Sequence, residues 1–252
     1  QKTAYEIPKR DWSSDVCSSD LKYFKNSLIA TTSAIGNTSY IYSINSSGVG
    51  TTVYSVATTI NDLAIHDNKL YVALNSGKVL RTTTGITYSD LITNLPPVKS
   101  LLSFSNKLWI GTGTSGLDYP DGKVYSYVAS NNTLSLSRTF TSASVNSFGK
   151  STKYLFTGLS GTLKGQIYHT DGNTWTQTLD TLENSVDTIE YNGGSSQVWA
   201  GDSSGAVYSI SFNNDNTIKT SSRIYDQFTD KYYNFTNGAD NNRSEEHTSE
   251  LQ

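Results

Sequence analysis

A strand–turn–strand unit recurs along this 252-residue sequence, and its period constrains the fold more than any other feature. Each copy has a hydrophobic-aromatic strand, a polar turn and a second strand that begins near a glycine, as in LYVALNSGKVL from Leu70. Four anchor glycines lie 45, 43 and 40 residues apart, at Gly77, Gly122, Gly165 and Gly205. A fixed period of this length is the signature of a repeat architecture.

A second phrase, an apolar residue followed by two polar residues and another apolar residue, precedes each copy. It occurs at residues 60–63, 98–101, 145–148 and 186–189. Each such tetrad begins a strand that leads into a polar turn, so one unit has four short strands, the strand count of a propeller blade. No stretch carries the helical period that a parallel α/β fold needs. We therefore predict an all-β fold, a β-propeller with about five recognisable four-stranded blades of a larger, incomplete ring.

The run TDGNTW at residues 170–175 resembles the Asp-box of sialidase-like propellers, although it is one residue shorter. The expected structure is a tight turn in which Asp171 accepts backbone N–H groups, Gly172 permits the turn and Trp175 packs between sheets. The run LWIGTGTSGLDYPDGKVYSY from Leu108 resembles the repeats of two-component regulator propellers, with residues 118–121 as an insertion. The strands are also similar to WD40 and YVTN repeats. These resemblances imply a propeller superfamily and no single member of it.

The two ends of the chain resemble translated short-read sequencing adapter. Residues 243–252, RSEEHTSELQ, and residues 11–21, DWSSDVCSSDL, match the two strands of the adapter, and residues 1–7 match an adjoining primer. On this interpretation residues 1–21 and 243–252 are not native, and residues 22–242 are a propeller fragment. The expected blades span about 22–59, 60–97, 98–144, 145–185 and 186–231, and residues 232–242 begin another.

Charge and composition exclude several classes of function. The formal net charge is −3, whereas a nucleic-acid surface needs a basic excess. No apolar run has the length of a membrane span. The adapter-like flanks contain the single cysteine, Cys17, so the remaining segment offers no Cys/His metal site. We expect no metal, no cofactor, no nucleic-acid partner and no membrane span in this segment.

In propellers the ligand face lies at one end of the central channel, where loops enter the inner strands and connect the second and third strands. The second residue of each tetrad and the longest loops therefore provide the candidate ligand-binding residues. They are Asn61, Lys99, Asn146, Asp187, Asp118, Tyr119, Asp121 and Asp202. Tyr119, in the longest loop, is the favoured single contact, because a rigid aromatic face suits glycans and protein loops alike.

We predict no catalytic residue with a defined role. A sialidase needs several arginines for the substrate carboxylate, and residues 22–242 contain three, at positions expected in third or outer strands. The leading hypothesis is a non-enzymatic propeller that binds a glycan or a protein loop, within a longer secreted or cell-surface microbial protein. One alternative is a glycoside hydrolase of the sialidase-like or xyloglucanase-like class, with carboxylates among Asp118, Asp121 and Asp187 or in missing blades. Another is the periplasmic sensor of a two-component regulator.

Overall fold

The computed structural model describes residues 21–32, 37–113, 121–161, 165–180, 185–192, 197–226 and 231–232. All regular secondary structure in these ranges is β-strand, arranged in five antiparallel sheets whose strand order follows the chain. Of the adapter-like flanks 1–21 and 243–252, residues 1–20 and 243–252 lie outside the described residues, and so do residues 233–242 of the next blade expected at 232–242. Leu21, at the edge of the first flank, begins β1.

Four sheets have four strands each, and the fifth has one additional short strand. The first sheet contains β1 (Leu21–Phe24), β2 (Ser27–Thr31), β3 (Ser39–Ile44) and β4 (Gly50–Val56). The second contains β5 (Ile60–His66), β6 (Lys69–Leu74), β7 (Val79–Thr82) and β8 (Ser89–Ile92). The third contains β9 (Val98–Phe104), β10 (Lys107–Thr112), β11 (Gly122–Val128) and β12 (Thr133–Phe140). The fourth contains β13 (Ala143–Lys150), β14 (Leu155–Gly161), β15 (Gln166–Thr170) and β16 (Trp175–Asp180). The fifth contains β17 (Val186–Asn192), β18 (Gln197–Asp202), β19 (Val207–Phe212), β20 (Ile218–Asp226) and β21 (Lys231–Tyr232).

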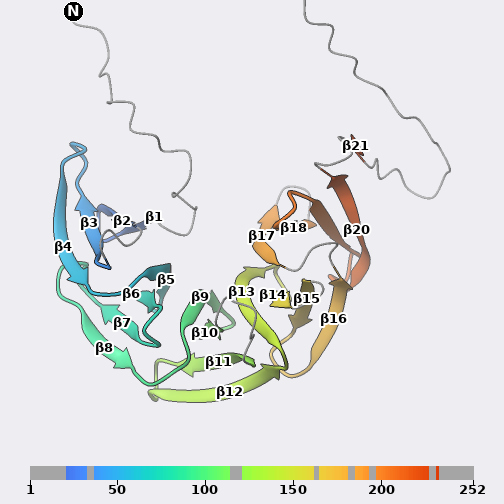
Figure 1. The fold of residues 1–252 in the computed structure, drawn as a ribbon, viewed down its shortest axis with the longest axis horizontal. Coiled ribbons are helices and arrows are strands. Elements are labelled where there is room, and N and C mark those ends of the chain that lie inside the picture. Colours follow the sequence, from blue (N-terminus) through green and yellow to red (C-terminus); the bar gives the residue numbers. More distant parts are fainter. Residues whose placement is uncertain are drawn as a thin grey trace, which may run out of the picture.

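The sheets are the blades of an open propeller. Figure 1 shows them fanned in an arc, with β1, β5, β9, β13 and β17 toward the middle and the fourth strands at the rim. The first and fifth sheets occupy the two ends of the arc and do not meet. The predicted all-β propeller with five recognisable blades is thus confirmed. Ala143 and Ser144, which were expected at the end of the third blade, lie in β13 of the fourth sheet.

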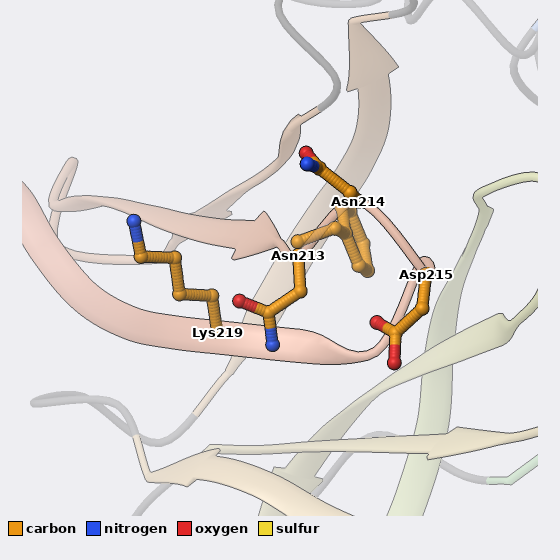
Figure 2. A pocket seen from close by; sticks show the side chains of 5 residues that line it. Asn213, Asn214, Asp215 and Lys219 are labelled. Atoms are coloured by element: carbon orange, nitrogen blue, oxygen red, sulfur yellow. The ribbon is translucent and has the colours of Figure 1, made fainter.

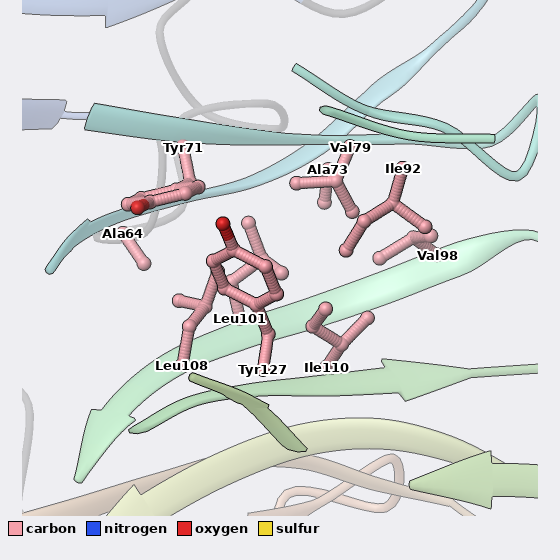
Figure 3. Packing of buried hydrophobic residues seen from close by; sticks show 10 residues of the cluster. All are labelled: Ala64, Tyr71, Ala73, Val79, Ile92, Val98, Leu101, Leu108, Ile110 and Tyr127. Carbon is pink, nitrogen blue, oxygen red and sulfur yellow. The ribbon is translucent and has the colours of Figure 1, made fainter. Parts of the chain in front are cut away.

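Hydrophobic cores lie between consecutive sheets, and there are four of them among the described residues. They form because successive side chains of a strand point to opposite faces, so that each blade supplies apolar residues to both neighbours. In β10, Leu108 and Ile110 pack against the second sheet, whereas Trp109 packs against the fourth. Figure 3 shows the core between the second and third sheets, where Tyr71 of β6 lies near Tyr127 of β11. Burial of these faces holds the arc together.

The turn at 170–175 has the expected geometry. The Asp171 carboxylate accepts the backbone N–H groups of Asn173 and Thr174 at 2.9 and 3.2 Å, and Gly172 has φ of +105°. Trp175 packs between sheets, with its ring edge-on to those of Trp109 and Phe140 of the third sheet. The second blade repeats the turn: the Thr84 hydroxyl accepts two backbone N–H groups, Gly85 has φ of +82°, and Tyr88 takes the place of the tryptophan. The relation to the Asp-box itself stays a prediction.

We expect Trp175→Ala to lower the free energy of unfolding by about 2 kcal/mol. The substitution removes two edge-on ring contacts and the hydrogen bond from Trp175 Nε1 to Ser137 Oγ, at 3.1 Å, all of which join adjacent sheets. Urea unfolding measures the loss. The matched control is Trp199→Ala at an exposed tryptophan, which should change the free energy by less than about 0.5 kcal/mol. Equal losses in the two variants would contradict the inter-sheet role of Trp175.

Candidate functional site

The second residue of each tetrad is a β-bulge in the inner strand of its sheet. The β5–β6 register passes from Ile60 directly to Asp62 and leaves Asn61 without a partner on β6. The same step leaves out Lys99 in β9, Asn146 in β13 and Asp187 in β17. A bulged residue is unpaired, and its side chain is re-aimed relative to the strand, which is why bulges occur beside binding sites.

These four bulged residues line one cavity of about 510 Å³ at the middle of the arc. It is bordered by the inner strands β5, β9, β13 and β17, together with Lys22 of β1. Four of the eight predicted ligand-binding residues, contributed by four consecutive blades, are therefore brought together. The remaining wall is polar as well as apolar, since Asp62, Ser100, Ser147, Thr188 and Glu190 belong to it beside Leu63, Leu101 and Ile189.

Each of the two bulged asparagines also ties its own blade to the following one, the second blade to the third and the fourth to the fifth. Asn61 Nδ2 donates to the carbonyl oxygen of Val98 at 2.6 Å, and Asn146 Nδ2 donates to that of Val186 at 3.4 Å. Both acceptors are the first tetrad residue of the following sheet. Asn146 Nδ2 also lies 3.2 Å from the carboxylate of Asp187, which accepts the Ser185 hydroxyl at 2.5 Å. The asparagines thus fix the spacing of the cavity wall.

The lysines of the cavity have no carboxylate partner within ion-pairing distance among the described residues. Lys99 Nζ donates to Asn75 Oδ1 at 3.1 Å, and burial lowers the pKa of this ammonium group. Lys150 Nζ donates to the carbonyl oxygen of Ser103 at 3.0 Å. Lys99 therefore retains hydrogen-bond donors for an oxygen-rich ligand, because an ammonium group carries three.

Asp62 is a buried carboxylate of the cavity wall that the sequence analysis did not select. Its Oδ1 accepts the N–H of Leu63 at 2.7 Å, and its Oδ2 accepts the N–H of Leu101 at 2.7 Å and the Ser100 hydroxyl at 3.2 Å. Burial raises the pKa of Asp62 to about 7, although these hydrogen bonds and the charge of Lys22 act in the opposite direction. The signal in the sequence was its place in the third position of a tetrad.

Asp202 is the last residue of β18, directly before the β18–β19 turn, and its carboxylate has several hydrogen-bond partners. Its carboxylate accepts the backbone N–H groups of Ser204 and Ala206, each at 3.0 Å, and the Tyr208 hydroxyl at 2.8 Å. The residue is buried and is absent from the lining of the cavity. Its carboxylate organises the turn of the fifth blade.

The longest loop is only partly described. Asp118 and Tyr119 lie outside the described residues. Asp121 is exposed immediately before β11, and its carboxylate accepts the backbone N–H of Ser142 at 3.1 Å. Ligand binding by Asp118, Tyr119, Asp121 and Asp202 stays a prediction.

A second recess lies on the β19–β20 hairpin (Figure 2). Asn213, Asn214 and Asp215 form its turn, and Lys219 follows on β20. Asp215 Oδ1 accepts the N–H and the hydroxyl of Thr217 at 3.0 and 2.6 Å, which also lowers the pKa of Asp215. All residues of this recess belong to one hairpin, and the polar side chains of Asp215 and Thr217 bond to each other within its turn.

Among the described residues there is no helix long and apolar enough to cross a membrane.

Comparison with known proteins bears on the fold. No family model and no curated protein matches the sequence. A chain of the nidogen–laminin complex superposes with a TM-score of 0.57 at 10% identity, covering 82% of this chain and 78% of that one. The extracellular domain of a B. thetaiotaomicron protein assigned to the one-component systems superposes with a TM-score of 0.61 at 18% identity. That match covers 83% of this chain, which spans only 29% of the other.

Two further solved structures are named for their fold or activity. The Dos1 propeller has a TM-score of 0.52 at 18% identity, covering 76% of this chain and 54% of that one. A gluconolactonase from Xanthomonas campestris has a TM-score of 0.53 at 12% identity, covering 76% and 70%. At such identities the likeness shows the fold alone. The chain has the fold of a β-propeller.

Proposed function

We propose that this chain is a non-enzymatic binding or sensing propeller that holds a glycan or a protein loop at the mouth of its central channel. The observation that carries the proposal is the convergence of four bulged residues, one from each of four consecutive blades, on one cavity of about 510 Å³. Amide, ammonium and hydroxyl groups from a rigid wall are suited to ligands with many hydroxyl or carbonyl oxygens. We place this propeller in a longer secreted or cell-surface microbial protein.

The partners of the cavity carboxylates favour binding over glycoside hydrolysis. A glycosidase needs one carboxyl group as acid and a second as base or nucleophile, on either side of the sugar bond. Both oxygens of Asp62 accept backbone N–H groups, and Asp187 accepts a hydroxyl and an amide N–H within its own wall. These contacts hold both carboxyl groups in the wall of the cavity, where they join one blade to the next.

Two alternatives to simple binding can be tested separately. A sensor role agrees with the likeness to an extracellular signalling domain, which is the domain that superposes with a TM-score of 0.61. A hydrolase would use carboxylates among Asp118, Asp121 and Asp187, and release of reducing sugar that is lost in Asp187→Asn would favour it over simple binding.

We expect Lys99→Met to weaken glycan binding about tenfold, because a half-buried ammonium donor is replaced by an apolar group of similar length. The measurement passes the full chain over immobilised neutral and uronic-acid oligosaccharides and over a panel of loop peptides. Tyr119→Ala is expected to weaken binding as well. Lys219→Met, on the β19–β20 recess, is the matched control and should bind like the wild type. Failure of the whole panel to bind, or equal binding by Lys99→Met, would refute the proposal.

A further inference from the structure

The ammonium group of Lys99 is held at the beginning of β9, in the middle of the arc, with the second and fourth blades on either side (Figure 1). The side-chain oxygen of Asn75 accepts hydrogen bonds from Lys99 Nζ at 3.1 Å and from Asn61 Nδ2 at 3.4 Å. Asn75 is itself held by the bond from its backbone N–H to the carbonyl oxygen of Thr59, at 2.9 Å. The end of the Lys99 side chain is therefore positioned before a ligand binds.

No carboxylate neutralises this ammonium group by direct contact within the described ranges. Both ion pairs found there are formed by side chains that do not line the cavity. Burial lowers the pKa of Lys99, because a half-buried charge has lost part of its water. Asn75 supplies one neutral acceptor, whereas the ammonium group has three N–H donors. Its charge and two of its donors are therefore available to a ligand.

Two carboxylates share the tetrad end of the inner strands with Lys99, and both are bonded within the wall. Asp62 Oδ2 accepts the N–H of Leu101 at 2.7 Å, and burial raises the pKa of Asp62 to about 7, so that much of its charge is lost at neutral pH. Asp187 lies two blades away from Lys99, and its carboxylate accepts Asn146 Nδ2 at 3.2 Å. In the described part of the second, third and fourth blades, Lys99 thus has no carboxylate partner.

The amides beside Lys99 suit a ligand with many hydroxyl groups. Asn61 and Asn146 occupy the same bulged position in the neighbouring blades and use their amide nitrogens within the wall. Their side-chain oxygens accept no hydrogen bond from the described residues, so both can accept one from a ligand. A uronic acid carries several hydroxyl donors beside its carboxylate on each ring, whereas a peptide backbone carries one N–H per residue.

We propose that the cavity selects acidic glycans, with the carboxylate of a uronic acid paired to Lys99 and ring hydroxyl groups bonded to Asn61 and Asn146. This inference rests on the proposed function, because it names the class of ligand for the same cavity. The three side chains come from three consecutive blades that are all present, so the contacts need nothing beyond the described sheets.

The test compares acidic oligosaccharides with their own methyl esters, which keep the rings and linkages but lose the negative charge. The full chain is passed over immobilised oligogalacturonate and oligomannuronate and over the ester of each. The wild type should bind one of the acids about tenfold more tightly than its ester. Lys99→Gln keeps a hydrogen-bond donor without the charge, so it should bind acid and ester equally. Lys99→Arg keeps the charge and should retain a preference for the acid.

Lys219→Gln, on the β19–β20 hairpin, is the matched control and should bind like the wild type. Equal binding of acid and ester by the wild type, or a preference that survives in Lys99→Gln, would overturn the inference while the binding function stands. A peptide of alternating glutamate and glycine that binds more tightly than every sugar would assign the cavity to a protein loop and overturn it as well. Failure of every sugar and of the peptide to bind would refute the proposed function together with the inference.

Discussion

Replacing Gly77 with alanine is expected to lower the free energy of unfolding by about 3 kcal/mol or more. Gly77 has φ of +80°, a backbone region that side chains disfavour, and a Cβ atom there would overlap the carbonyl oxygen of Leu95 and lie 2.9 Å from its carbonyl carbon. Leu95 cannot withdraw freely, because its N–H donates to the Gly77 carbonyl oxygen at 3.1 Å. The substitution therefore strains the turn and breaks the contact between two connections of the second blade.

Gly48→Ala is the matched control for this loss. Gly48 has nearly the same φ, +78°, but a Cβ atom there would meet nothing within 4 Å. Gly48→Ala should therefore lower the free energy of unfolding only by the cost of placing a side chain at positive φ, about 1 kcal/mol. Guanidinium unfolding of the two variants separates the cost of the positive φ from the cost of the overlap with Leu95. If the two losses in the free energy of unfolding agree within about 0.5 kcal/mol, the overlap is relieved at no cost.

The repeat predicted the blades because one physical rule serves every copy, alternation of apolar residues along short strands between tight turns. The pattern does not predict why each blade has a glycine at its anchor position. Gly77 and Gly205 have positive φ, whereas Gly122 lies close to the backbone of β13, where a Cβ atom would approach Val145 N to 2.9 Å. Glycine at the same position of the repeat thus permits a positive φ in two blades and a close approach of the neighbouring sheet in another. Only the packing of neighbouring sheets distinguishes the two roles.

The candidate site was predicted in part for the same reason. The second tetrad position was expected near the channel, and Asn61, Lys99, Asn146 and Asp187 do line one cavity. That each is a bulge could not be read from the sequence, because a bulge depends on the register with the partner strand.

Asp62 was missed for a different reason. It occupies the tetrad position that Ser100, Ser147 and Thr188 fill in other blades, which suggested an ordinary polar strand residue. Its carboxylate is buried because the third sheet closes over it and supplies the N–H of Leu101. That contact joins residues 39 positions apart and has no local signature.

Asp62 should make the stability of the fold fall as the pH rises. Burial raises its pKa from 3.8 to about 7, so between these values the folded chain holds a proton that the unfolded chain has lost. Its contribution is fully present below about pH 4 and is lost as the pH rises through 7, with a total change of about 4 kcal/mol. The Ser100 hydroxyl, 3.2 Å from Oδ2, is the partner that can accept the carboxyl proton, because the other two partners are backbone N–H groups.

Asp62→Asn isolates this contribution, because the amide has the size of the carboxyl group and does not titrate. Burial lowers the pKa values of His66 and His169, so they add a slope of the opposite sign as the pH falls through 6.5, and both remain in the variant. Urea unfolding of both proteins from pH 4 to 8 should therefore give a difference that moves in favour of the variant as the pH rises. A difference that stays constant over this range would mean that Asp62 is ionised throughout, with Leu63, Leu101 and Lys22 compensating its charge in full.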